Sequence, residues 1–198
     1  MRKCLFIAVC ALLVSQCSTP DVNSDKLIVG ASIAPLADFA KQVGGDKVDV
    51  FTIVPPGANP HSFELTPGLM VKLNKTDLLV FNGVGLEFWL DKVMENLQGK
   101  KATFTSDGLA IQADAQNEHD HATAEHSHDD HAHHDHAAGN PHVWLNPQNA
   151  IHQVKKVYYA LADIDPENKT SYENNAAFYI KHLEVVDQDI QQEVESWA

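Results

Sequence analysis

Beyond residue 17 this chain has no cysteine. Its 3 cysteines are Cys4, Cys10 and Cys17, so no disulfide can form in the rest of the sequence. A metal ion bound by that part of the chain must therefore be held by histidine, aspartate or glutamate side chains rather than by thiolates.

Positive charge is also scarce. The chain has 14 Lys and Arg residues against 27 Asp and Glu residues, which gives a formal net charge of -13. A protein of this charge repels phosphate backbones and anionic lipid surfaces. We therefore expect no nucleic-acid partner, and the acidity is compatible with cations as ligands.

Sequence signatures of catalysis are missing as well. The sequence contains no HExxH, GxSxG or GxxxxGK[ST] motif, and the GVG at 83–85 lacks the third glycine of a dinucleotide-binding loop. A zinc hydrolase remains conceivable, with His61 as a ligand and Glu64 as the nearby base. Glu64 is more simply a polar loop residue, and we predict that the protein is not an enzyme.

Long hydrophobic runs are absent except at the N-terminus. Arg2 and Lys3 precede LFIAVCALLV, which is too short for a stable transmembrane helix and has the size of a signal-peptide core. We predict a signal peptide over 1–16. The following VSQC resembles the lipobox of bacterial lipoproteins, which implies acylation of Cys17, a flexible tether over 17–26, and a lipid-anchored protein in the periplasm or on the outer face of the cell membrane. A simple secretory signal with Cys17 as an incidental residue is the alternative.

What the sequence does contain is a regular alternation of strand and helix patterns. Strand patterns occur at 26–32, 46–55, 77–83 and 101–106, and helical patterns lie between them at 34–45, 66–75 and 86–100. This order predicts an α/β fold, with a four-stranded parallel sheet flanked by helices. We place this N-terminal lobe at 27–165.

Prolines and capping residues support these helix boundaries. Four prolines stand where helices are expected to begin: Pro35, Pro67, Pro147 and Pro166. Proline is well tolerated at the first helical position. Three of them follow a residue that can cap a helix N-terminus: Thr66, Asn146 and Asp165.

The C-terminal segment predicts one long helix over 166–198. Its apolar stripe runs from Tyr179 to Trp197 without an internal helix breaker, and no stop signal follows. A helix of this length would project beyond the lobe. We interpret it as a linker helix, with a second lobe missing after it.

Histidines concentrate in one tract, EHDHATAEHSHDDHAHHDH at 118–136. The tract has no apolar residue larger than alanine, so we expect a disordered loop over 108–139. Imidazole and carboxylate groups are ligands for divalent transition metals, zinc first among them, although a solvated insert without a role is the simpler alternative. The candidate auxiliary ligands are His119, His121, His126, His128, His131, His133, His134 and His136.

Two further histidines, His61 and His142, each follow an Asn-Pro pair. Proline restricts its own backbone and that of the preceding residue, so each imidazole would stand on a stiff loop. The loop with His61 follows a predicted strand, at the sheet edge where parallel α/β proteins bind ligands; the tract leaves the place of His142 open. Either could instead be an ordinary turn histidine.

The remaining notable side chains have simpler interpretations. We assign no role to His152 and His182, which fall within predicted helices. Four aromatic residues are expected to pack in the core: Phe88, Trp89, Trp144 and Trp197.

The strings GANPHSFELTP, VFNGVGLEFWLDK and NPHVWLNP, in this order, with a His-rich insert before the last, resemble ZnuA-like metal-binding proteins of bacterial ABC importers. The resemblance implies one lobe of a two-lobed periplasmic-binding-protein fold, with His61 and His142 as metal ligands. A third histidine and an acidic ligand normally come from the second lobe. In zinc-type members the His-rich loop gathers zinc, whereas manganese-type members generally lack one.

On this basis we predict an extracytoplasmic protein that captures Zn²⁺ and delivers it to an ABC-transporter permease. A manganese-type member of the same family is one alternative. Another is a passive zinc buffer or surface adhesion lipoprotein that uses the His-rich loop alone.

Overall fold

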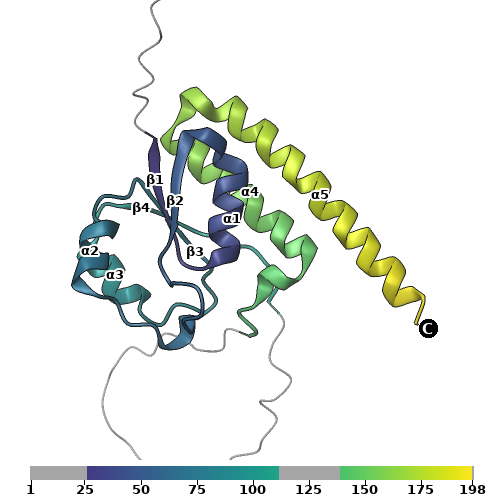
Figure 1. Ribbon diagram of the computed structural model, residues 1–198, viewed down its shortest axis with the longest axis horizontal. Helices are drawn as coiled ribbons and strands as arrows, with labels where there is room; N and C mark the ends of the chain where they lie inside the picture. The colour runs from purple at the N-terminus through teal and green to yellow at the C-terminus, as the bar shows by residue number, and fades with distance from the viewer. Residues whose placement is uncertain (1–25, 112–138, 198) are drawn as a thin grey trace, which may run out of the picture.

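The computed structural model describes residues 26–111 and 139–197. Four short strands form one parallel sheet: β1 (Leu27–Ala31), β2 (Val48–Thr52), β3 (Leu78–Phe81) and β4 (Lys101–Phe104). Their order across the sheet is β2-β1-β3-β4 (Figure 1). The predicted four-stranded parallel sheet is confirmed, and β3, whose four residues LLVF are all buried, lies inside it.

Helices cover both faces of this sheet (Figure 1). On one face α1 (Ala34–Gly44), α4 (Pro147–Ile164) and α5 (Lys169–Glu195) share a core with β1. On the other face α2 (Pro67–Leu73) and α3 (Leu90–Asn96) enclose a second, smaller core. The side chains of β3 alternate between the two, since Leu78 and Val80 belong to the first core and Leu79 and Phe81 to the second.

Two of the three predicted helix caps are confirmed. Thr66 Oγ1 accepts a hydrogen bond from the backbone N–H of Leu69 at the start of α2, and Asn146 Oδ1 accepts those of Gln148 and Asn149 at the start of α4. The third prediction was wrong, because the carboxylate of Asp165 caps no backbone group. It accepts the hydroxyl of Tyr172 at 2.6 Å instead.

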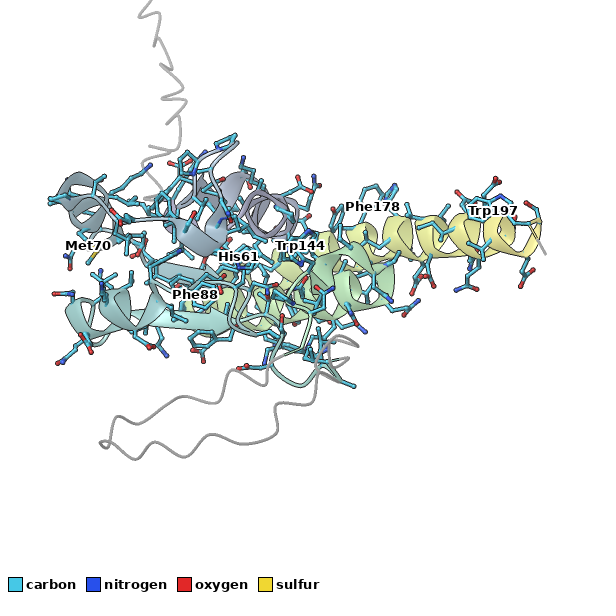
Figure 2. All side chains as sticks on the ribbon, turned by 90° about the horizontal axis from the view of Figure 1, so that it is seen from below. His61, Met70, Phe88, Trp144, Phe178 and Trp197 are labelled. Atoms are coloured by element: carbon cyan, nitrogen blue, oxygen red, sulfur yellow. The ribbon has the colours of Figure 1, made fainter. Side chains whose placement is uncertain are left out.

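Helix α5 begins three residues later than predicted, after a short 3-10 turn over Pro166–Asn168. Its first turns pack against α1, where the hydroxyl of Tyr179 donates to Asp38 Oδ2 at 3.0 Å. Its second half extends past the rest of the lobe toward Trp197 (Figures 1 and 2). Within the described part of the chain, no helix is long and apolar enough to cross a membrane.

Several predictions fall outside the described residues. These are the signal peptide at 1–16, Cys17, nearly all of the tether at 17–26, and the eight tract histidines.

The contact between Tyr172 and Asp165 leads to a stability prediction. Partial burial raises the pKa of Asp165, but hydrogen bonds from Tyr172 and Asn168 outweigh this effect, and the net pKa lies below the usual 3.8. Tyr172→Phe should lower the free energy of unfolding at pH 7 by about 1–2 kcal/mol, since the hydrogen bond to Asp165 is only partly buried. A carboxylate with a lowered pKa stabilises the fold above pH 3.8 and loses that effect as pH falls. The loss in Tyr172→Phe should therefore shrink at acidic pH.

Urea denaturation between pH 3 and pH 7 measures this difference. Tyr159→Phe is the matched control, because that side chain is 63% exposed and its replacement should change nothing. An equal loss at both ends of the pH range would contradict the role of the Asp165 carboxylate.

Candidate metal site

The two histidines outside the tract stand on turns of the same construction. Asn59 Oδ1 accepts the backbone N–H of His61 at 2.9 Å, and Asn140 Oδ1 accepts that of His142 at 3.0 Å. In each turn the intervening residue is a proline with a fixed φ. The repeated Asn-Pro-His sequence therefore encodes one local structure used twice.

The fold brings these two turns together. The turn with His61 follows β2, and that with His142 precedes α4, yet the centroids of the two imidazole rings are only 5.6 Å apart. The ring of His142 also packs against that of Trp144, with centroids 5.3 Å apart; Figure 2 labels His61 and Trp144. Two imidazoles bound to one tetrahedral zinc at about 2.0–2.1 Å would have ring centroids roughly 5 Å apart. The pair is thus spaced for a shared metal ion.

The hydrogen bonds of His142 determine which ring nitrogen is free. Asn140 Oδ1 also lies 2.9 Å from His142 Nδ1. The same Asn140 atom accepts the backbone N–H of His142, so it must be the amide oxygen and not the nitrogen. Nδ1 must then carry a hydrogen, and Nε2 of the neutral ring keeps its lone pair for a metal ion.

A hollow of about 600 Å³ opens beside His142, between the start of α4 and the second half of α5. Ala110 and Ile111 line it together with Asn140, so the described residues on both sides of the tract meet at this hollow. Asp187 of α5 also lines it, but its Oδ2 atom accepts hydrogen bonds from Gln148 and Gln191.

The described residues provide two candidate ligands for this metal site, His61 and His142. In the ranges 26–111 and 139–197 no group of three or more His, Cys, Asp or Glu side chains could hold a metal ion. Glu64, the base considered for a hydrolase, is exposed and lines a separate hollow with Met70 and Trp89.

The predicted helix over 86–100 begins only at Leu90, because the preceding loop has a different structure. Gly83, Val84 and Gly85 all have positive φ, and the carboxylate of Glu87 turns back to accept the backbone N–H groups of Asn82 and Gly83 at 2.8 and 3.0 Å. Burial raises the pKa of Glu87 above its usual 4.5, against these hydrogen bonds.

The predictions for the other aromatic and histidine residues had mixed outcomes. Trp89 is buried and Trp144 packs against the first core, as predicted. The prediction was wrong for Phe88 and Trp197, which are 61% and 73% exposed; the ring of Phe88 lies 5.9 Å from that of His61. His152 and His182 each hydrogen-bond a backbone carbonyl, of Asp107 and Phe178.

The fold and the paired histidines place this chain in the class of parallel α/β lobes that carry their candidate ligands on loops at one sheet edge. A family model described as ZnuA, the periplasmic component A of a zinc-uptake complex, matches residues 29–198. The chain belongs to this family, whose members are substrate-binding proteins for transport.

Named relatives include transport proteins for two metals. The chain is 33% identical to the manganese ABC transporter substrate-binding lipoprotein scaA of Streptococcus gordonii, over 96% of this chain and 60% of that protein. It is 34% identical to the high-affinity zinc uptake system protein ZnuA of Bacillus subtilis, over 91% of this chain and 57% of that protein. The chain thus spans little more than half the length of these relatives.

A solved structure shows the same fold. The Zn(II)-bound ZnuA-like domain of Streptococcus pneumoniae AdcA superposes with a TM-score of 0.67 at 26% identity, covering 82% of this chain and 54% of that one. The predicted likeness to one lobe of the periplasmic-binding-protein fold is confirmed.

The contact between Asn140 and His142 generates a prediction about the metal-free protein. In Asn140→Ala the Nδ1–H of His142 loses its acceptor, so the neutral ring should shift toward the tautomer with hydrogen on Nε2. Ring ¹⁵N chemical shifts of His142 at pH 8 measure this change. His182→Ala is the control, because the His182 ring contacts Phe178 of its own helix, and it should leave the His142 signals unchanged. A His142 ring already protonated on Nε2 in the parent protein would contradict the assignment.

Proposed function

We propose that this chain is the metal-capturing part of a zinc importer, and that His61 and His142 bind the transported Zn²⁺. The observation that carries this proposal is the pair of like-built Asn-Pro-His turns, with ring centroids 5.6 Å apart. Turns restrained by proline hold the ligands in place before the metal arrives, which reduces the entropy lost on binding.

The family supports a role in metal uptake through an ABC transporter. Substrate-binding proteins of this kind hand their cargo to a membrane permease, and we propose such a permease as the partner. Relatives named as lipoproteins support acylation of Cys17, after a signal peptide at 1–16, and a place in the periplasm or on the outer face of the cell membrane. Residues 17–26 would then be the tether, 27–165 the metal-binding lobe and 166–198 the linker helix.

Zinc is favoured over manganese by ligand chemistry. Imidazole nitrogen is a good ligand for zinc, whereas manganese prefers carboxylate, carbonyl and water oxygens. The site offers two imidazoles, and the one carboxylate that the described residues contribute to the adjoining hollow, that of Asp187, already accepts two hydrogen bonds. The His-rich tract, whose eight histidines would form an auxiliary site, points to zinc for the same reason.

The remaining ligands of a tetrahedral zinc would come from outside the described residues. The named relatives are longer than this chain, and we propose that in a protein of their length the part that this chain does not match supplies the missing ligands. Passive zinc buffering by the tract is the second candidate function, because the described residues provide two ligands and the tract eight.

Zinc titration by calorimetry tests the proposal on the soluble chain from Ser18. A version without residues 118–136 should lose weak multi-site binding and keep one tighter 1:1 event. His61→Ala or His142→Ala in that version should weaken the 1:1 event at least about tenfold, since each removes a direct ligand. Manganese should bind more weakly than zinc.

His182→Ala is the matched control, because its ring contacts Phe178 of the same helix, and it should bind zinc like the parent. If all binding disappears with the tract, passive buffering describes this chain better than capture at His61 and His142.

A further inference from the structure

The loop from Asn82 to Trp89, called the 82–89 loop below, connects β3 to α3 and contacts both histidine turns. At its start, Asn82 Nδ2 donates to the backbone carbonyl of Pro141 at 2.9 Å. At its end, the indole Nε1 of Trp89 donates to the backbone carbonyl of Pro60 at 3.3 Å. Each of these carbonyls belongs to the residue directly before a candidate ligand.

The two donors are held by buried surroundings. Asn82 is fully buried, and its Oδ1 atom accepts Gln153 Nε2 at 3.0 Å, which fixes the direction of the amide. Trp89 is 5% exposed, and its ring packs edge-on against those of Phe63 and Phe81. Neither donor can turn away from its carbonyl without disturbing a core.

The backbone between the donors is also restrained. Val84 is a β-branched residue with φ of 54°, a conformation that L-residues with branched side chains rarely adopt. Such a backbone persists only when its surroundings hold it there. Here the buried carboxylate of Glu87 does so, by accepting the N–H groups of Asn82 and Gly83.

We propose that the 82–89 loop is a clamp that sets the spacing of His61 and His142, with Asn82 and Trp89 as its positioning residues. The proposal rests on the proposed function, because spacing matters only if both imidazoles bind one metal ion. The histidines come from distant parts of the sequence, and the 82–89 loop hydrogen-bonds the turns of both. Positioning partners of this kind typically change metal affinity about 10–100-fold when removed.

The first test measures spacing in the metal-free protein. In the chain from Ser18, NMR should show a nuclear Overhauser effect between the rings of His61 and His142, assigned with the two His→Ala variants. Asn82→Ala should weaken or abolish this signal, because the Pro141 carbonyl loses its donor. Trp89→Phe, which keeps an aromatic ring but has no N–H, should do the same through His61.

The second test measures affinity at the two rings separately from the tract. Zinc is titrated while the ring signals of His61 and His142 are followed, and Asn82→Ala should raise the apparent Kd about tenfold or more. In a His142→Ala background the same substitution should have no further effect on zinc binding at His61, because Asn82 acts through His142. A loss caused only by general destabilisation would persist in that background.

Thr105→Val is the matched control. Thr105 Oγ1 accepts Gln153 Nε2 at 2.9 Å in the same buried network but contacts neither histidine turn, so this variant should lower Tm and keep both the ring signal and the zinc affinity. If Asn82→Ala folds and keeps both the parent's nuclear Overhauser effect and its zinc affinity, the clamp proposal is wrong. If Asn82→Ala does not fold, Trp89→Phe decides. If zinc shifts the NMR signals of neither ring in the parent protein, the proposed function fails. The nuclear Overhauser effect between the two rings still decides whether the 82–89 loop is a clamp.

Discussion

The candidate site depends on one buried carboxylate. Glu87 lies at the carboxyl end of β3, where burial opposes its ionisation, and it remains hydrogen-bonded through both oxygens to the backbone of Asn82 and Gly83. These two bonds close a tight loop in which Gly83, Val84 and Gly85 have positive φ. That loop delays the start of α3 to Leu90, and it directs Asn82 and Trp89 toward the two histidine turns.

The sheet, its helices and the position of His61 could be predicted from the sequence because they depend on local patterns. Runs such as LLVF and LIVGA, separated by amphipathic segments, define buried parallel strands and their crossover helices. Thr66 and Asn146 cap helices through backbone groups two or three residues away. His61 follows β2 closely enough that the strand pattern alone places it at the carboxyl edge of the sheet, where parallel α/β proteins generally bind ligands.

The remaining features depend on contacts between distant residues. The turn that carries His142 accepts a hydrogen bond from Asn82 at the carbonyl of Pro141, between residues 59 positions apart, which no local pattern reveals. The segment LEFWLDKVMENL has helical spacing throughout, yet Glu87 and Trp89 lie in the loop and make its hydrogen bonds. Tertiary contacts therefore override the local helical preference. Asp165 has the sequence of a helix cap, but a hydroxyl seven positions later competes for its carboxylate.

The acceptor behind His142 has a consequence for how readily a metal ion could leave. A histidine ligand becomes more electron-rich when its second nitrogen donates to a carboxylate, and such pairing strengthens the bond to the metal. Asn140 presents a neutral amide oxygen instead, which polarises the ring less and adds no negative charge. If His142 binds the transported zinc, as we propose, the protein must release the metal ion as well as capture it, and a neutral acceptor favours release over permanent retention.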